Sequence, residues 1–267
     1  MNICVTGGAG FIGSHLVDRL IELGHDVLVI DNLSTGMRSF VHEDAQFIEM
    51  DVRDPKLLSV FEEFKPSIVF HEAAQTMVQS SMENPSYDCD VNLIGLINVL
   101  DACRKVKVEQ FLMPSSAAVY GDLAVLPLTE DLSGMPSSFY GLTKLTAEGY
   151  LRIYHEAFGL NTVCFRYANV YGPRQGDGGE GGVISIFNRL IVEGQPLTVF
   201  GDGEQTRDFI YVDDVVDANI KAMGNGQCTG IYNVSTNMGT SVNELITRFR
   251  AISGTDFRSE EHTSELQ

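Results

Sequence analysis

Tyr140 and Lys144 are spaced for proton transfer. They form a YxxxK pair in the segment YGLTK, and side chains four residues apart on a helix lie on the same face. A phenol, with a pKa of about 10, is a poor base at neutral pH, but a nearby positive charge favours the phenolate and lowers that pKa. The alternative is an ordinary solvated helix face, because this spacing often arises by chance.

Ser115 and Ser116 give the pair its context. They end the fifth expected strand, in the segment PSSAAVYG, at the carboxyl edge where parallel sheets bind ligands. The Ser116 hydroxyl can hydrogen-bond a substrate oxygen that is being oxidised. Its alternative role is to cap a helix or a turn.

A glycine loop, TGGAGFIG, follows the first expected strand and precedes a helix. Gly7 permits a tight turn, Gly10 lets the backbone approach a pyrophosphate, and Gly13 lets the helix pack close to the strand. The N-terminus of that helix attracts phosphates through its amides and dipole. The spacing is GxxGxxG rather than the usual GxGxxG, and glycines are also common in ordinary turns. Their place between a strand and a helix favours a dinucleotide.

Asp31 ends the second expected strand, where a carboxylate accepts both hydroxyls of an adenine ribose and repels a 2′-phosphate. Asn32 follows at a position where an NADP enzyme often has Arg, so NAD is the predicted cofactor. A turn-capping Asp is the alternative. Asp51, at the end of the third strand, is expected either to touch adenine or to cap a helix. The positive nicotinamide ring of NAD would also favour the phenolate of Tyr140.

Alternating strands and helices must position these groups. Near-continuous apolar runs, typical of strands buried on both faces, occupy residues 2–6, 26–31, 67–71, 110–113 and 162–166. Stripes with helical spacing occupy residues 11–24, 90–107 and 140–158. The alternation predicts an α/β fold with a doubly wound parallel sheet of the Rossmann type.

The pattern changes after about residue 170. A glycine-rich loop at 172–182 precedes a helix signal at 183–194 and a strand-like segment at 197–200. Segments 209–212 and 230–234 are expected to return to the main sheet, with a helix at 214–223 between them.

These changes divide the chain into two expected domains. The first is an NAD-binding Rossmann domain of residues 1–166, to which 209–235 returns. The second is a smaller, incomplete C-terminal substrate cap of residues 167–208 and 236–257. The last ten residues, RSEEHTSELQ at 258–267, match the in-frame translation of a common sequencing-library adapter. They are expected to be a non-native tail that cuts the cap off near Phe257, with a polar natural terminus as the alternative.

Composition excludes several classes of protein. Hydrophobic residues make up 44% and charged residues 20% of the chain, as in globular rather than disordered proteins. A net charge of −18 argues against nucleic acid as a partner. No apolar run suits a membrane helix and no basic, apolar leader precedes the first strand, so we expect no membrane partner and a cytoplasmic protein. The five cysteines lack CxxC spacing and the six histidines lack HxxxH or HxH pairs, so no metal site is predicted.

Together these motifs resemble the extended short-chain dehydrogenases/reductases of the NAD-dependent epimerase/dehydratase family, and within them most closely the UDP-glucose 4-epimerase group. The resemblance runs from residue 2 to about residue 257. The segments that carry it are, in order, TGGAGFIG, DNLSTG, HEAAQ, SSAAVYG, YGLTK, RYANVYGPRQ and GDGEQTRDFIYVDD. The set is specific for the superfamily and less specific for the substrate.

The resemblance implies NAD-dependent epimerisation at C4 of a nucleotide sugar of the UDP-glucose/UDP-galactose type, through a transient 4-keto intermediate. Tyr140 would remove the proton from the 4′-hydroxyl while hydride passes from C4′ to NAD⁺. Ser116 would assist the proton movement at the substrate, and Lys144 would bind the nicotinamide ribose and keep the phenol ionised. Asn169 and Arg207 would contact the diphosphate of the substrate. The cofactor would be lined by Gly7, Gly10, Phe11, Ile12, Gly13, Asp31, Asn32, Ser34, Gly36, Asp51, Val52, Ala73, Ala74, Asn92, Tyr140, Lys144 and Ala168.

Alternatives remain for the substrate residues and for the reaction. Arg207 could form a surface ion pair with Asp208, and Asn169 could cap a loop. Related dehydratases have an acidic pair, and decarboxylases a Glu, where this sequence has Ala117 and Ala118, so elimination of water lacks its acid–base catalyst. The competing hypotheses are a nucleotide-sugar reductase or dehydratase, and an NAD-binding fragment with little activity.

Three further expectations concern residues without a catalytic role. His71 is expected to be a hydrogen-bonded residue of the core or its rim. Asp213 and Asp214 are expected to cap the helix that follows them. A homodimer formed through the helices near 90–107 and 140–158 is expected from the family alone.

Overall fold

The computed structural model describes residues 1–176, 182–254 and 257, and the backbone of residues 259–262. The chain forms two units, Met1–Tyr167 with Val212–Val234 and Ala168–Tyr211 with Ser235–Gln267. The assignment of the first unit to NAD and of the second to substrate stays a prediction. Within the described residues, none of the helices combines the length and the apolar character that a bilayer span requires.

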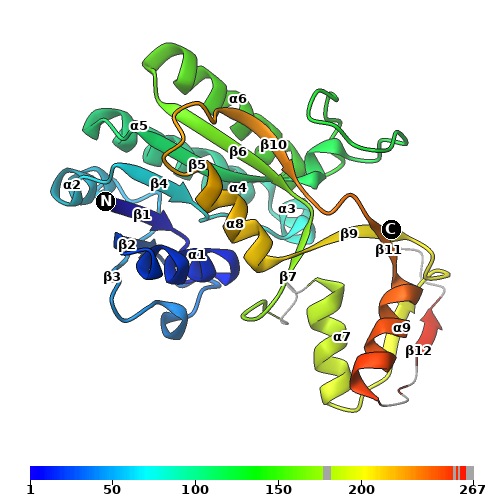
Figure 1. Ribbon diagram of the computed structural model, residues 1–267. Helices are drawn as coiled ribbons and strands as arrows, with labels where there is room; N and C mark the ends of the chain where they lie inside the picture. Colours follow the sequence, from blue (N-terminus) through cyan, green and yellow to red (C-terminus); the bar gives the residue numbers. More distant parts are fainter. Residues whose placement is uncertain (177–181, 255–256, 258, 263–267) are drawn as a thin grey trace. The chain divides into compact units, whose positions relative to one another are not determined.

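A parallel sheet of seven strands forms the centre of the first unit (Figure 1). The strands are β1 Asn2–Thr6, β2 Asp26–Asp31, β3 Gln46–Glu49, β4 Ile68–His71, β5 Gln110–Ser116, β6 Asn161–Tyr167 and β10 Gly230–Val234. Their order in space is β10-β6-β5-β4-β1-β2-β3, so the winding reverses between β1 and β4. Ligands bind at such a switch point, outside the carboxyl ends of the strands. The predicted doubly wound sheet is confirmed.

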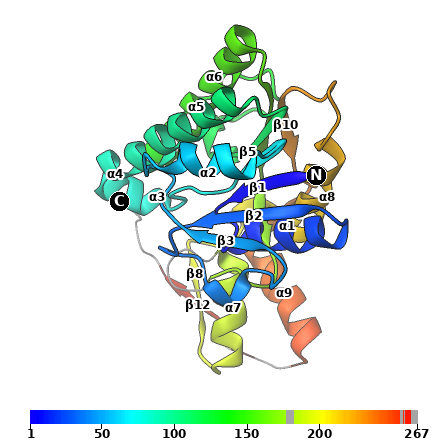
Figure 2. The ribbon, with the colours of Figure 1, turned by 90° about the vertical axis from the view of Figure 1, so that its left-hand side faces the viewer.

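Helices cover both faces of this sheet (Figure 2). One face carries α1 Phe11–Glu22 and α8 Val212–Ala222, and the other carries α2 Leu57–Phe64, α5 Leu96–Val106 and α6 Phe139–Phe158. Because both faces are covered, the inner strands β1, β2, β4, β5 and β6 consist mainly of buried residues, most of them apolar. Two short helices, α3 Val78–Glu83 and α4 Pro85–Cys89, and a π-helical segment, Asp90–Gly95, lead into α5. Short 3₁₀ helices occur at Arg38–Phe40 and Ala117–Tyr120.

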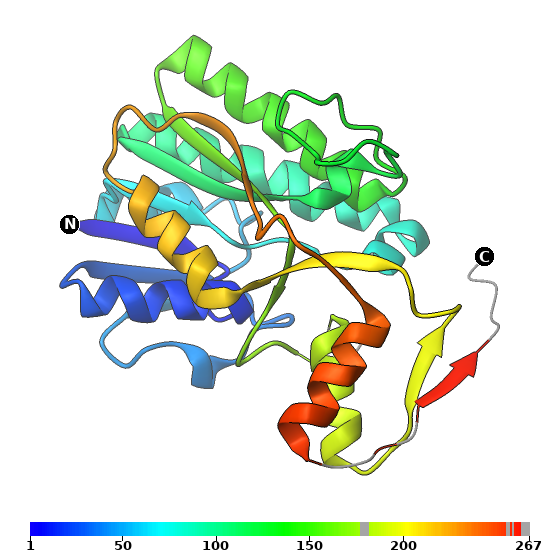
Figure 3. The same ribbon diagram turned by 45° about the vertical axis from the view of Figure 1, so that its right-hand side comes forward.

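The described residues of the second unit form two small sheets and two helices, which Figure 3 shows. A three-stranded sheet has the order β11-β9-β7, formed by Gly239–Ser241, Thr206–Tyr211 and Asn169–Tyr171. Helices α7 Val183–Val192 and α9 Val242–Ser253 pack around a core of Phe187, Leu197, Val199 and Ile246. Strand β8, Leu197–Phe200, pairs in parallel with β12, Ser259–His262.

The structure corrects one prediction of strand placement. Segment 209–212 was expected in the main sheet, but β9 pairs in parallel with β7 and antiparallel with β11 in the second unit. The segment 230–234 does return to the main sheet, as β10 beside β6. Residues 177–181 of the predicted glycine-rich loop, and 258 and 263–267 of the predicted tail, lie outside the described residues. The origin of that tail stays a prediction.

Candidate active site

The glycine loop forms a tight cradle between β1 and α1. Gly7 has a left-handed backbone, with a φ of 72°, and a Cβ there would overlap the backbone of Ala73. A Cβ at Gly13 would overlap the carbonyl oxygen of Gly7. At Gly10 a Cβ would meet the same oxygen at 3.2 Å and no other described atom within 4 Å. The glycines therefore allow close packing inside the loop and leave its outer side open.

The N-terminus of α1 has the features of a phosphate site. Its N-cap residue, Gly10, provides no side-chain hydrogen bond, and the first turn carries no acidic residue. The first amides of a helix have no partner within the helix, so those of Phe11, Ile12 and Gly13 are directed outward. An open glycine face and outward amides fit the pyrophosphate of a dinucleotide.

Asp31 braces this loop from the end of β2. Its Oδ2 accepts a hydrogen bond from the Ala9 amide at 3.0 Å, and its Oδ1 accepts one from the Leu33 amide at 2.8 Å. The side chain is buried, and each oxygen keeps a lone pair that a ribose hydroxyl can use. Gly36 lies against the same loop, because a Cβ there would contact the Ala9 backbone. Ser34 is held by its amide, which donates to Asn32 Oδ1 at 3.0 Å.

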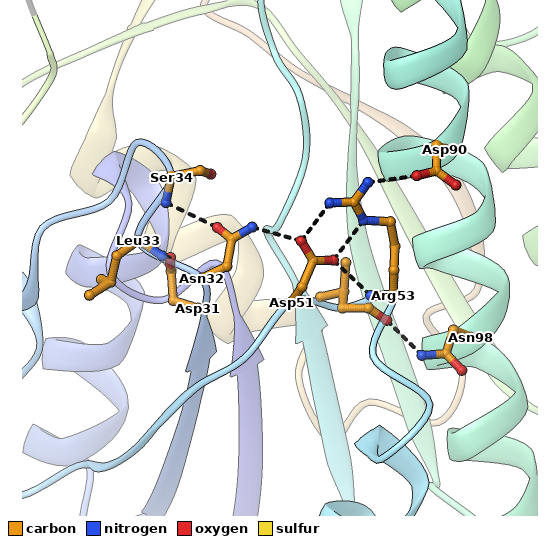
Figure 4. A network of polar contacts seen from close by, with 9 residues as sticks. Asp31, Asn32, Leu33, Ser34, Asp51, Arg53, Asp90 and Asn98 are labelled. Carbon is orange, nitrogen blue, oxygen red and sulfur yellow. Dashed lines mark hydrogen bonds and ion pairs between the residues drawn. The ribbon is translucent and has the colours of Figure 1, made fainter.

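A second network links the ends of β2 and β3 (Figure 4). Asp51 accepts hydrogen bonds from Asn32 Nδ2 at 2.8 Å and from the Arg53 guanidinium at 2.7 and 2.8 Å. Arg53 Nη1 also donates to Asp90 at 2.6 Å, so two carboxylates neutralise this cation. These hydrogen bonds hold the pKa of Asp51 well below its usual range. The alternative in which Asp51 caps a helix is wrong, because the N-cap residue of α2 is Lys56.

The remaining predicted cofactor residues lie around the loop that follows β4. Val52 is buried in the core, and its carbonyl accepts a hydrogen bond from Asn98 Nδ2 at 2.7 Å. Ala73 packs against Gly7, and Ala74 follows it in the loop. Asn92 is buried, and its side chain bonds the amide of Gln75 at 2.9 Å and the carbonyl of Gln75 at 3.0 Å. The side-chain amide of Asn92 thus holds the loop that follows β4 at Gln75.

The structure brings Ser116, Tyr140 and Lys144 together at the carboxyl end of β5. Helix α6 begins after Ser138, whose hydroxyl accepts a hydrogen bond from the Gly141 amide at 3.1 Å. Lys144 Nζ lies 5.9 Å from the centroid of the Tyr140 ring and donates to the Pro114 carbonyl at 2.9 Å. The Ser116 hydroxyl caps the short helix behind it by accepting from the Ala118 amide at 3.1 Å. The predicted capping role of Ser116 is therefore observed, and the same hydroxyl also interacts with the Tyr140 side chain and opposes the effect of burial on the pKa of that phenol.

The electrostatics of the pair differ from the expectation. Burial raises the pKa of Tyr140 to about 12, the Ser116 hydroxyl opposes this increase, and the charge of Asp88 adds to it. Burial also lowers the pKa of Lys144, against the charges of Glu72 and Asp88. The expected lowering of the phenol pKa is therefore not produced by the groups of the chain itself.

A buried ion pair that the sequence analysis missed lies behind Ser116. Glu148 and Arg166 form two hydrogen bonds, at 2.9 and 2.8 Å, and both side chains are 4% exposed. Ser115 donates to the same carboxylate at 2.6 Å, and Arg166 donates to the Tyr120 hydroxyl at 2.8 Å. Glu148 is one helical turn beyond Lys144, but no local spacing indicates its partner on β6.

His71 and the two aspartates of α8 have structural surroundings. His71 Nδ1 lies 2.8 Å from the Thr6 hydroxyl, and burial, with a contribution from Lys144, lowers its pKa to about 3. The prediction of a hydrogen-bonded core residue is confirmed. Asp213 and Asp214 lie in the first turn of α8, where their charge suits the helix dipole.

In the second unit, Asn169 and Arg207 line one cavity of about 320 Å³, together with the aromatic residues Tyr171, Phe187, Phe200 and Phe209. Asn169 Nδ2 donates to the Asp208 carbonyl at 3.0 Å, as a loop-fixing residue would. Arg207 Nη1 donates to the Thr206 carbonyl at 2.8 Å. Its alternative ion pair with Asp208 does not occur among the described residues, since that carboxylate accepts from Thr236 instead. Ala168 is the first residue of this unit.

The first unit is thus a dinucleotide-binding fold with a Ser, Tyr and Lys at its ligand edge, and comparisons with known proteins define it further. The model of the NAD dependent epimerase/dehydratase family matches residues 3–235. A putative UDP-glucose 4-epimerase of Methanocaldococcus jannaschii is 46% identical over 91% of this chain and 79% of its own length. The crystal structure of the Thermotoga maritima UDP-glucose 4-epimerase with UDP-glucose has a TM-score of 0.95 at 41% identity, over 100% of this chain and 87% of that one. That of the Thermus thermophilus enzyme with NAD has a TM-score of 0.94 at 39% identity, over 100% and 88%.

The chain belongs to the NAD-dependent epimerase/dehydratase family. The predictions of family, Rossmann fold and NAD as the cofactor are confirmed.

Proposed function

We propose that this protein interconverts the C4 epimers of a UDP-sugar of the glucose/galactose type. The predicted class of enzyme, an NAD-dependent epimerase, is supported by relatives of that class that match nearly the whole chain. The observation that carries the proposal is the placement of Tyr140 and Lys144, with Nζ 5.9 Å from the ring centroid, at the ligand edge beside Ser116. Bound NAD supplies the hydride acceptor and donor for C4 of the sugar.

The residues of the chain supply the proton chemistry. The Tyr140 oxygen takes the proton of the 4′-hydroxyl and returns it after the sugar has presented its other face. Ser116 hydrogen-bonds the same oxygen of the substrate, and the ammonium of Lys144, together with the positive ring of bound NAD⁺, would stabilise the phenolate. Ala117 and Ala118 form the short helix that follows, and they provide no carboxyl group for elimination of water. We assign Asn169 and Arg207 to the diphosphate, since a guanidinium forks onto phosphate oxygens.

Incubation with UDP-galactose tests this reaction. We expect UDP-glucose to form without net production of NADH, and Tyr140→Phe to stop turnover while NAD stays bound. Tyr150→Phe, on the same helix, is the matched control and should remain active. Net NADH or a stable 4-keto product would favour a reductase or dehydratase. A protein that binds NAD but gives no product would favour the inactive fragment.

We also infer a homodimer formed through the helices of one face of the sheet. Large apolar side chains on these helices and the segment before them are about half exposed: Ile94 at 53%, Leu142 at 48%, Ile153 at 51% and Phe158 at 52%. Covering such side chains is favourable. Ile153→Glu should then give a monomer in light scattering, whereas Ile252→Glu on α9 should not. A monomeric parent protein would contradict the inference. The cytoplasmic location stays a prediction.

A further inference from the structure

Asp88, on the short helix α4, is a fully buried acid that has no cationic partner within the part of the chain that the structure describes. Its side chain is 0% exposed. Its Oδ1 accepts hydrogen bonds from Gln75 Nε2 at 2.7 Å and Asn92 Nδ2 at 3.2 Å, and its Oδ2 accepts one from the Thr143 hydroxyl at 2.8 Å. Among the described residues it forms no ion pair. Three converging donors suit a carboxylate, which only accepts.

A buried charge held by neutral groups alone is costly to a fold. Folded proteins usually pair such a charge, so a buried acid without an ionic partner calls for a local reason. The position of Asp88 supplies a reason for its presence, because its partner Thr143 lies on α6 between Tyr140 and Lys144. The Thr143 hydroxyl is also 3.0 Å from the Tyr140 carbonyl oxygen. Asp88 thus holds the turn of helix that carries the catalytic pair.

We propose that Asp88 is a positioning residue that holds this turn of α6 and, through its charge, adds to the retention of the protons on Tyr140 and Lys144 in the resting enzyme. This inference rests on the roles assigned to the pair under the proposed function. An epimerase uses one phenol both to take and to return a proton, so a phenol that is too acidic would return it poorly. The charge of Asp88 opposes that acidity.

The other titratable groups around the pair are neutral or only partly charged at neutral pH. Of the β4 strand and its loop, His71 is neutral because burial lowers its pKa to about 3, and Glu72 is partly protonated at neutral pH because burial raises its pKa to about 7. On β6, burial raises the pKa of the Cys164 thiol well above its usual range, so this group is also neutral. The charge of Asp88 raises the pKa of both Tyr140 and Lys144.

Asp88→Asn separates the charge from the hydrogen bonds. The amide oxygen can still accept from Gln75 and Asn92, and the amide nitrogen can donate to the Thr143 hydroxyl. In this variant we expect the acid limb of the pH profile of kcat, set by Tyr140, and the alkaline limb, set by Lys144, to move. Both should move to lower pH by about 0.5–2 pH units. A purely structural role would lower the plateau of the profile and leave its limbs in place.

Titration of the Tyr140 phenol gives a readout that needs no turnover. The absorbance at ~295 nm of the NAD-bound enzyme, minus that of a matched protein carrying Tyr140→Phe, follows this one phenolate. Its midpoint should fall in Asp88→Asn by the same amount as the acid limb of kcat. Asp101→Asn is the matched control. Asp101, on α5, also accepts a hydrogen bond from α6, because the Tyr154 hydroxyl donates to it at 3.0 Å. It should move neither the limbs nor the Tyr140 midpoint.

The proposal is overturned if a folded Asp88→Asn protein behaves like the parent enzyme. In that case the limbs of its kcat profile and the midpoint of its Tyr140 titration would stay within about 0.2 pH units of the parent values. If that variant does not fold, Thr143→Val serves in its place. It removes the hydrogen bond that holds the Asp88 carboxylate to α6, so the same movement is expected with a smaller size, and its absence overturns the proposal. If the parent enzyme gives no product from UDP-galactose but the phenol midpoint moves, the reaction assignment fails and the inference about Asp88 stands.

Discussion

Glu72→Gln should stabilise the protein at pH 8 and have a much smaller effect, of about 1 kcal/mol, at pH 5. Glu72 Oε1 is buried without a hydrogen-bond partner among the described residues. Burial raises the pKa of this acid from 4.5 to about 7, against the opposing charge of Lys144. Between these two values the unfolded chain loses the proton before the folded chain does, so stability falls as the pH rises. Above pH 7 both states are ionised and the loss is complete.

The difference between the two pKa values fixes the size of the effect. About 2.5 pH units, at about 1.4 kcal/mol each, correspond to roughly 3 kcal/mol at pH 8. Gln has almost the same shape and does not ionise, so the variant should recover most of this amount. In a protein of this size that is a rise in Tm of roughly 6–12 °C.

Thermal unfolding of the parent and variant at pH 5 and pH 8 measures this difference. Glu63→Gln, on the exposed side of α2, is the control and should change Tm by little at either pH. A gain of equal size at both pH values would show that the effect is one of packing. The absence of a gain at pH 8 would refute the inference that burial raises the pKa of Glu72 and destabilises the folded protein.

Arg166→Met should lower the free energy of unfolding by about 3–5 kcal/mol, because it leaves the buried Glu148 carboxylate without its partner; a loss below about 1 kcal/mol in calorimetry would contradict this. Gly13→Val should yield protein without NAD, because its side chain would overlap the Gly7 carbonyl oxygen that shapes the cradle. Cofactor content after acid release measures this, and stoichiometric NAD would show that the cradle tolerates the side chain. Arg207→Ala should raise the KM for UDP-galactose roughly ten- to hundredfold, the value of charged hydrogen bonds, with NAD content unchanged. An unaltered KM would remove Arg207 from the substrate site.

The main sheet was predictable because its strands share one physical requirement. Strands covered on both faces must be apolar throughout, and the runs at 26–31 and 162–166 became β2 and β6 with nearly the same bounds. The prediction that segment 209–212 joins the main sheet was wrong for a related reason. Strand β9, TRDFIY, mixes polar and apolar residues, and such a strand suits the centre of a small sheet as well as the edge of the main one. Its partner is decided by contacts that the periodicity of the sequence does not encode.

The site was predictable where its geometry is local. The spacing of Tyr140 and Lys144 implies a shared helix face, and the glycine loop implies a turn before a helix. The networks behind them join residues that are distant in the sequence, as in the pair of Arg53 with Asp90, 37 residues apart. Arg166 and Tyr120, 46 residues apart, are a second case. Only the order of strands in the sheet brings such partners together, so the motifs identified the reacting groups but not those that hold them.

The protonation state of Tyr140 needed the structure for a different reason, which is that opposite effects act on the phenol and their sizes depend on burial. A lysine four residues away argues for an acidic phenol. The same helix face, however, is buried, and burial penalises the phenolate and the ammonium alike. Lys144 also donates to the Pro114 carbonyl, so its charge is shared with the end of β5. The result is a pKa of about 12 for the phenol, at which the chain alone has almost no base at neutral pH. The positive ring of NAD⁺ would add a charge that favours the phenolate. The Tyr140 base should therefore form only in the enzyme that holds oxidised cofactor. As a result, the sugar should keep its hydroxyl proton until a hydride acceptor is in place.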